Sequence, residues 1–228
     1  MFQRKNEDDK HKINAGPSLF RLFAADIVEA DTPIMGGMCP HPTERVQLAL
    51  ERERVAKAQG LPSDMPPYVF VVNIAMPPWH MVFYYAVDDM SKIDGTDGTP
   101  SSKLCQKFFF GDDDEFRHNT FKLIPCIIEG NFMVRKAVGC TPAIMGNKIK
   151  QTYIKGDRYF ELMIDTGSSS VGAGVIRICV GYAKMIVTDL AFLFEGYDES
   201  TLPEKVLGCM RLRNVEFGKK LRFVHNYE

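Results

Sequence analysis

The chain lacks the features that mark several classes of protein. Its 28 basic and 29 acidic side chains leave a formal net charge of −1, whereas a nucleic-acid-binding protein needs a basic excess to replace phosphate counterions. No apolar run is long enough to span a bilayer, because the longest candidate, residues 171–194, contains Arg177, Lys184 and Asp189. We therefore expect neither a nucleic-acid partner nor a transmembrane segment.

Paired cysteines and a targeting segment are missing as well. The six cysteines form no C-x-x-C pair, and the N-terminal "MFQRKNEDDKHK" has neither the apolar stretch of a signal peptide nor the acid-poor character of a transit peptide. We expect reduced thiols in a cytoplasmic location. Cys39 and His41 in "MCPHP" have no second pair of ligands beside them, so we expect no metal and no cofactor.

The length suits one large domain. A chain of 228 residues can bury roughly 70–75% of its unfolded surface, so its core needs no metal or disulfide. We expect a disordered tail over residues 1–15, a single domain over residues 16–217 and a short C-terminal tail over residues 218–228.

Runs of β-branched and aromatic residues predict most of the strands. Residues 67–76 and 81–89 are continuous apolar runs on either side of "PPWH", which predicts a hairpin whose strands are covered on both faces or line a cavity. A strand is also expected in residues 18–31, and a helix capped by Thr43 over residues 43–58. The other expected elements are a short helix at 103–109 after a flexible loop with Ser102 as its cap, a strand at 121–130, an irregular stretch at 131–146, a hairpin around "KGD", and a strand near the end of residues 204–217.

One long helix is expected over residues 170–195. It would be roughly 40 Å long at 1.5 Å per residue. Its few polar positions fall within about 40° of one line, and nearly everything else is apolar. A helix with so narrow a polar stripe must be surrounded on most sides, which predicts a sheet wrapped around it.

The segment "IDTGSSS" before this helix spells the catalytic motif of aspartic proteases. Such an enzyme needs two carboxylates that share a proton, and the chain contains no second Asp-Thr/Ser-Gly. A strand-to-helix corner explains the same letters: Asp165 ends a strand, Gly167 permits a tight turn, and the following serines offer hydroxyls to the free N–H groups of the helix. Asp165 is then expected to hold the first helical turn, or a nearby Arg or Lys.

The residues from Phe121 to Gly196 resemble the C-terminal domain of the plant Enhanced Disease Resistance 2 family, and weaker similarity extends the match to residues 16–216. The elements that carry the resemblance are Phe121-Lys122-Leu123-Ile124-Pro125, Glu129-Gly130, Ala137-Val138-Gly139, Gly146, Tyr153, Tyr159, Glu161, Asp165-x-Gly167-Ser168-Ser169, Gly181-Tyr182, Asp189 and Glu195. The family reads Asp-Ile-Gly-Ser-Ser at the protease-like motif, which argues further against a protease.

The resemblance implies a lipid-associated context without a catalytic residue. The plant proteins carry this domain behind pleckstrin-homology and START modules and regulate defence-related cell death at membranes. This chain has no room for those modules, so their phosphoinositide binding does not transfer. Peripheral membrane contact is the expectation that remains.

We therefore expect an α+β fold, a curved and mostly antiparallel sheet around the long helix in a START-like or helix-grip-like arrangement. The expected function is non-enzymatic binding of a lipid or other hydrophobic ligand. A protein-interaction domain with a solid core is the alternative, and an aspartic-type hydrolase ranks third. The residues expected to line the pocket or meet a head group are Lys122, Arg135, Tyr84, Met163, Ser168, Ser169, Arg177 and Met185.

Overall fold

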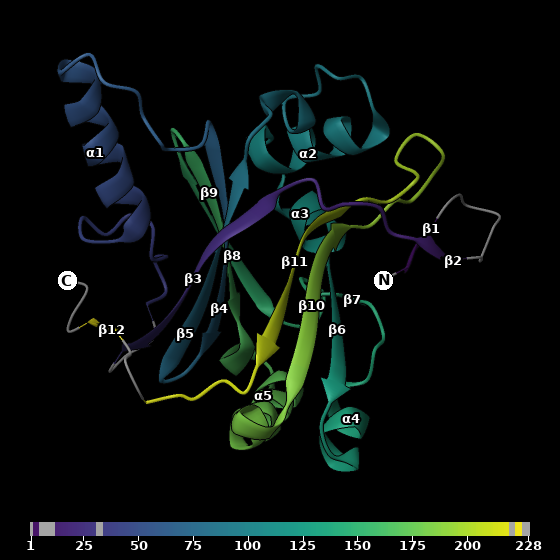
Figure 1. Ribbon diagram of the computed structural model, residues 1–228. Helices are drawn as coiled ribbons and strands as arrows, with labels where there is room; N and C mark the ends of the chain where they lie inside the picture. The colour runs from purple at the N-terminus through teal and green to yellow at the C-terminus, as the bar shows by residue number, and fades with distance from the viewer. Residues whose placement is uncertain (1, 5–11, 31–33, 219–221, 225–228) are drawn as a thin grey trace.

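Two β-sheets face each other across an apolar core in the computed structural model, which describes residues 2–4, 12–30, 34–218 and 222–224 (Figure 1). The larger sheet has the strand order β12 (Arg222–Val224), β3 (Arg21–Ala30), β5 (Trp79–Val87), β4 (Tyr68–Met76), β9 (Tyr159–Asp165) and β8 (Lys150–Gly156). The smaller sheet has the order β11 (Val206–Arg213), β10 (Val187–Phe194), β6 (Phe121–Glu129) and β7 (Ala143–Ile144). Only the pairs β4–β9 and β12–β3 are parallel among those described. The expected α+β class with a mostly antiparallel sheet is confirmed.

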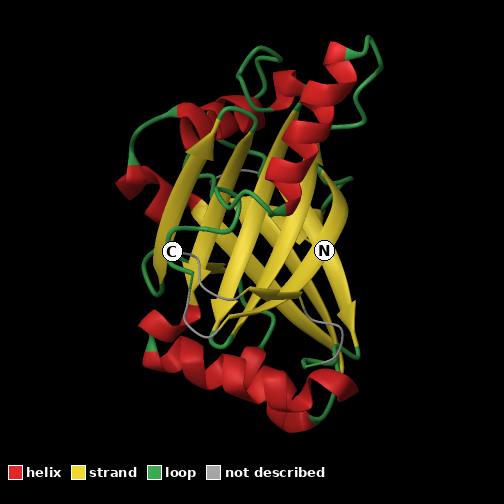
Figure 2. Cartoon of the chain, turned by 90° about the vertical axis from the view of Figure 1, so that its left-hand side faces the viewer, coloured by secondary structure: helices red, strands yellow, loops and turns green. Residues whose placement is uncertain are grey.

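The helices gather at the two ends of this sandwich (Figures 1 and 2). Helices α2 (Pro100–Phe110) and α3 (Asp114–Thr120) lie at one end, and α4 (Phe132–Val138) and α5 (Ser170–Tyr182) lie at the other. We call these the α2 end and the α5 end. Helix α1 (Arg45–Ala58) stands outside the larger sheet. No helix among the residues described is long and apolar enough to cross a membrane.

The hairpin of β4 and β5 is covered on both faces, as its unbroken apolar sequence predicts. All nine residues of β4 are buried. Side chains alternate along a strand, so Phe70 and Val72 reach the core between the sheets, whereas Val69 and Val71 join a second cluster on the outer face. This second cluster is covered by the loop before α1, through Ile34 and Met38 among others.

The prediction of one long helix over residues 170–195 is wrong. Helix α5 ends at Tyr182, a single 3₁₀ turn, η3 (Ala183–Met185), follows, and the chain then becomes β10 in the middle of the smaller sheet. A short, mainly apolar run such as residues 187–194 fits a buried strand as well as a buried helix. The neighbours β6 and β11 offer β10 hydrogen bonds on both edges, and this pairing decides between the two structures. The helix-grip resemblance stays a prediction.

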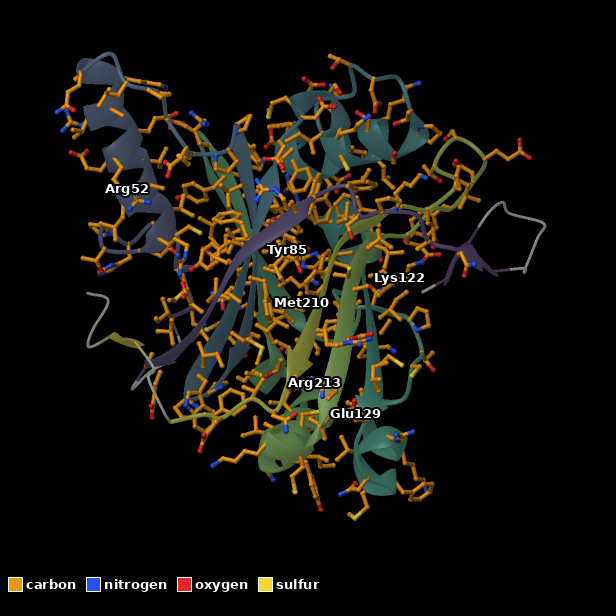
Figure 3. All side chains as sticks on the ribbon, in the orientation of Figure 1. Arg52, Tyr85, Lys122, Glu129, Met210 and Arg213 are labelled. Carbon is orange, nitrogen blue, oxygen red and sulfur yellow. The ribbon has the colours of Figure 1, made fainter. Side chains whose placement is uncertain are left out.

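Phenylalanines fill the α2 end of the core. Phe108 and Phe109 point from α2 toward Phe194 of β10, with ring centroids 4.2 and 5.9 Å away, and toward Phe160 of β9. Further along the core, the Tyr85 hydroxyl lies 3.9 Å from the Met210 sulfur, between the sheets (Figure 3). Phe108 and Phe109 are buried in this cluster, so the core is solid at the α2 end.

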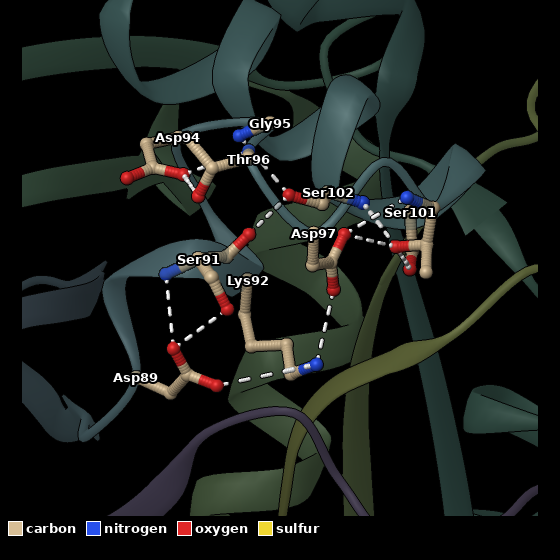
Figure 4. A network of polar contacts seen from close by, with 10 residues as sticks. Asp89, Ser91, Lys92, Asp94, Gly95, Thr96, Asp97, Ser101 and Ser102 are labelled. Carbon is tan, nitrogen blue, oxygen red and sulfur yellow. Dashed lines mark hydrogen bonds and ion pairs between the residues drawn. The ribbon is translucent and has the colours of Figure 1, made fainter.

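Hydrogen bonds from side chains of the loop itself hold the loop before α2 in place (Figure 4). The carboxylates of Asp89, Asp94 and Asp97 each accept a hydrogen bond from a backbone N–H two residues ahead. Thr99 is the residue that caps α2, since its hydroxyl accepts from the Ser102 N–H. The Ser102 hydroxyl, which we expected to cap the helix, donates to the Ser91 carbonyl instead.

Much of the two expected tails lies outside the described residues. Within the first, β1 (Phe2–Arg4) and β2 (Lys12–Asn14) pair as a short antiparallel hairpin. Within the second, β12 pairs with β3. Residues 1, 5–11, 219–221 and 225–228 are not described.

Candidate functional site

A cavity of about 710 Å³ opens between the two sheets at the α5 end. Ligand sites usually have volumes of about 300–1,000 Å³ and are lined mainly by apolar side chains. The residues that line the cavity come from both sheets, from α4 and α5, and from the loop that follows α4, among others. They are Ile74, Met76, Met81, Leu123, Pro125, Ala137, Val138, Thr141, Pro142, Ala143, Met145, Lys148, Ile149, Ile164, Thr166, Ser169, Val171, Gly172, Val175, Ile176, Cys179, Val180, Ala183, Ile186, Thr188, Leu190, Leu212, Val215 and Phe217.

Helix α5 shows how hollow this end of the core is. Its sequence, SVGAGVIRICVGY, carries one charge, yet none of its residues is buried. Val175, Ile176 and Val180 turn toward the cavity, where a packed core would have covered them. An apolar helix face that meets empty space forfeits dispersion contacts, and a hydrophobic ligand would restore them.

The mouth of the cavity lies beside the N-terminus of α5. Val171, Thr141, Pro142 and Lys148 line the cavity and are also exposed to solvent, so they mark its opening. Among the described residues, Lys148 is the only charged one in the lining. The sequence analysis missed it, because a lysine in an irregular segment carries no signal of its position relative to a distant helix.

The "IDTGSSS" segment forms the predicted strand–turn–helix corner next to this mouth. Strand β9 ends at Asp165, η2 (Thr166–Ser168) follows, and Ser169 caps α5 by accepting from the Gly172 N–H at 3.3 Å. The Asp165 carboxylate accepts a hydrogen bond from the Gly167 N–H at 3.0 Å. Asp165 thus stabilises the turn that precedes α5, and not the first turn of the helix.

Among the residues predicted to form the ligand site, only Ser169 lines the cavity. Ser168 also stays in the corner, where its hydroxyl donates to the Asp165 carbonyl and accepts from the Lys150 N–H. Arg177 and Met185 are exposed on the outer side of α5 and η3. The Arg135 guanidinium donates to the carbonyls of Gly130 and Ile128 at the start of α4.

Lys122, Tyr84 and Met163 lie in other parts of the molecule. The Lys122 ammonium is buried between the carboxylates of Glu195 and Glu204, 2.7 Å from each. The Tyr84 hydroxyl donates to Glu44 at 2.6 Å, behind the larger sheet, and Met163 is fully buried on that sheet's outer side. None of the three is in the cavity lining.

A second polar cluster lies buried on the outer face of the larger sheet. The Glu161 carboxylate, with no exposed surface, accepts hydrogen bonds from the backbone N–H groups of Met38 and Cys39 and from the Asn73 amide, at 2.8–2.9 Å. Asn73 in turn accepts from Nδ1 of His80 at 2.9 Å, and Nε2 of His80 accepts from the Ile34 N–H at 3.2 Å. The cluster ties the loop before α1 to the sheet. Glu44, and not the expected Thr43, caps α1 in the same region.

The buried His80 gives stability a dependence on pH. Burial lowers the pKa of His80 to about 4, because a charged ring would be desolvated. Between pH 6.5 and 4 the unfolded chain binds a proton at this position that the folded chain does not. We expect this single group to lower the free energy of unfolding by about 3 kcal/mol as the pH falls through that window.

Urea titrations of wild type and His80→Gln between pH 7 and pH 4 check this expectation. The variant should show the shallower loss of stability, while His118→Gln, a half-buried histidine on α3, should follow the wild-type profile. Identical profiles for His80→Gln and wild type would show that His80 does not contribute to the acid sensitivity.

Four of the cysteines are poor candidates for an activated nucleophile. All six are free. Burial raises the pKa of Cys39, Cys105 and Cys179, and a hydrogen bond with Cys140 raises that of Cys126 to about 11. A reactive thiol needs a lowered pKa. The described residues also contain no group of three or more His, Cys, Asp or Glu that could hold a metal ion.

Comparisons with known proteins place the chain in a family. The family model for the C-terminal region of the protein Enhanced Disease Resistance 2 matches residues 5–216. An Enhanced Disease Resistance 2-like protein of Arabidopsis thaliana is 36% identical over 217 residues, which cover 94% of this chain and 27% of that protein. The chain thus spans about a quarter of the relative's length, and no solved structure matches it significantly. With these matches over nearly its whole length, the chain belongs to the Enhanced Disease Resistance 2 C-terminal family.

Proposed function

We propose that this domain binds a hydrophobic ligand, such as a lipid acyl chain, without chemically changing it. The observation that carries the proposal is the apolar cavity of about 710 Å³ beneath α5. Its volume and its mainly apolar lining suit an apolar molecule better than water, since such a cavity offers ordered water few hydrogen-bond partners.

The polar groups of the cavity support an amphipathic ligand. They are few, and the charged one, Lys148, stands at the mouth. The Thr166 hydroxyl donates to the Ala75 carbonyl, and the Ser169 hydroxyl is used in capping α5, so both are already satisfied within the protein. An apolar chain inside and a polar or anionic group near Lys148 is the orientation that this arrangement favours.

The cavity also supports ligand binding over the alternative of a solid-core interaction domain. In a solid core the inner side chains of α5 would be buried, as Phe108 and Phe109 of α2 are. The hydrolase alternative has less support, because the Asp165 carboxylate serves the local turn.

A cavity-filling substitution tests the proposal. In Val175→Phe, a larger side chain on the inner face of α5 would occupy part of the cavity. We expect at least a tenfold loss of affinity, about 1.4 kcal/mol, for a fluorescent fatty acid, with the thermal midpoint unchanged or raised. Val55→Phe adds the same group on the outer helix α1 and should bind the probe like wild type.

Native mass spectrometry of the gently purified protein provides an independent measurement. We expect a bound mass that organic solvent extracts and that Val175→Phe loses. A wild-type protein that carries no ligand and fails to bind the probe, or a Val175→Phe variant that binds it as tightly as wild type, would overturn the proposal.

A further inference from the structure

The most exposed large apolar side chains of the described residues all lie at the α5 end. They are Phe132 and Met133 at the start of α4, Val171 at the start of α5, and Met185 in η3, with 76, 63, 75 and 64% of their surface exposed. Helices α4 and α5 pack against each other through Val134, Val138, Ile178 and Tyr182, so they form one continuous surface (Figure 1). Exposed apolar residues concentrated in this way mark an interaction surface.

The charges on this surface have one sign. The segments of α4, α5 and η3 contain Arg135, Lys136, Arg177 and Lys184 and no acidic residue, although the whole chain has a formal net charge of −1. Lys136 and Arg177 are exposed and have no ion pair among the residues described. Of the neighbouring acidic groups, Glu129 pairs with Arg213 above α4 and α5 in Figure 3, and Glu216 pairs with Lys184. The Asp165 carboxylate, in the turn before α5, accepts a hydrogen bond from the Gly167 N–H.

We propose that the α5 end docks on an anionic lipid bilayer, with Phe132, Met133, Val171 and Met185 in the interface and Lys136 and Arg177 facing the lipid phosphates. Helices that lie in the plane of a membrane combine exposed apolar residues with lysine and arginine in this way. Each basic residue near an anionic leaflet adds about 1 kcal/mol of attraction. A second protein chain would not need the charges to be of one sign.

The docked orientation brings the bilayer to the mouth of the cavity. Val171 belongs to the docking surface and lines the cavity as well, and Lys148 stands at the same opening. A lipid chain could therefore pass between bilayer and cavity without crossing water. This step rests on the proposed ligand binding; the docking itself does not, because it depends on the outer side of the helices.

Co-sedimentation with vesicles tests the docking. The vesicles contain phosphatidylcholine and phosphatidylserine in roughly a two-to-one ratio, since anionic lipid supplies the surface potential. Wild type should bind, less in high salt, and less to phosphatidylcholine alone. The double variant Phe132→Ser/Met133→Ser should lose binding, and Arg177→Glu should weaken it about fivefold or more. These side chains are exposed, so the fold should be retained.

Matched controls lie on α1. Leu48→Ser and Arg52→Glu change exposed residues of the same types on the far side of the molecule, where Figure 3 shows Arg52, and should bind vesicles like wild type. Val175→Phe should also bind vesicles while it loses the fatty-acid probe, and Phe132→Ser/Met133→Ser should keep the probe. These two results separate failure of the docking from failure of the proposed function.

Two outcomes would overturn the docking. One is equal vesicle binding by wild type and Phe132→Ser/Met133→Ser. The other is no vesicle binding by wild type. A concentration-dependent dimer in analytical ultracentrifugation that this double variant abolishes would then show that the surface joins two copies of the chain.

Discussion

Replacing Glu161 by leucine is expected to destabilise the fold by about 3 kcal/mol or more. The substitution leaves three buried donors without an acceptor: the backbone N–H groups of Met38 and Cys39 and the Asn73 amide. Each orphaned buried donor costs about 1–3 kcal/mol. Since Asn73 also holds His80, the loop before α1 should loosen together with its contacts on the sheet.

Chemical denaturation of the variant, with hydrogen exchange at residues 34–44, measures this effect. Glu161→Gln keeps one acceptor oxygen and should lose less. Glu51→Leu removes an exposed glutamate whose ion pair, in the described part of the chain, is with Arg54 on α1, and it should change the free energy of unfolding by less than about 0.5 kcal/mol. A Glu161→Leu protein as stable as Glu51→Leu would contradict the role of this cluster.

Replacing Lys122 by methionine is expected to cost about 3–5 kcal/mol, because breaking a buried ion pair leaves uncompensated charge. The Lys122 ammonium holds two carboxylates, Glu195 and Glu204, at 2.7 Å each, and both side chains are largely buried. Without the lysine, two negative groups would repel each other at the junction of β6, β10 and the loop before β11.

A double-mutant cycle measures this coupling. Lys122→Met/Glu204→Gln should recover part of the stability that Lys122→Met loses, because the double variant removes one of the two carboxylates left without a partner. Lys103→Met on the exposed side of α2 serves as the control. Additive effects of Lys122→Met and Glu204→Gln would show that the two groups are not coupled.

These two predictions concern residues whose importance the sequence signals only in part. The alternation in "RYFELMID" predicts that Glu161 faces away from Phe160 and Leu162, and the structure confirms that it does. The pattern does not reveal that the loop before α1 covers that face and supplies its N–H groups. For Lys122, the sequence leaves open a head-group role, a surface position or an ion pair. The structure shows a buried ion pair, which exists because the loop after β10 folds back over β6.

The candidate cavity, too, was predicted only in part from the sequence. A pocket between the sheet and the apolar helix was predicted, and of the residues assigned to it Ser169 lies in the lining of the cavity. The others lie elsewhere in the structure, and their ligand roles stay predictions. The predicted ligand roles of Arg177 and Met185 remain predictions. Their position on the outer side of α5 and η3 is what led us to the docking surface.

Local sequence by itself determined much of this protein: the β4–β5 and β8–β9 hairpins, the helix α1, the strand–turn–helix corner at Asp165, and the family. Each depends on side-chain alternation, turn residues or caps within a short stretch. Only the tertiary structure decided that the apolar run after Tyr182 leaves the helix and becomes β10, because the hydrogen bonds that β6 and β11 provide come from distant segments. The cavity is a consequence of this change of structure. Because α5 ends at Tyr182, it covers one end of the sandwich without filling it.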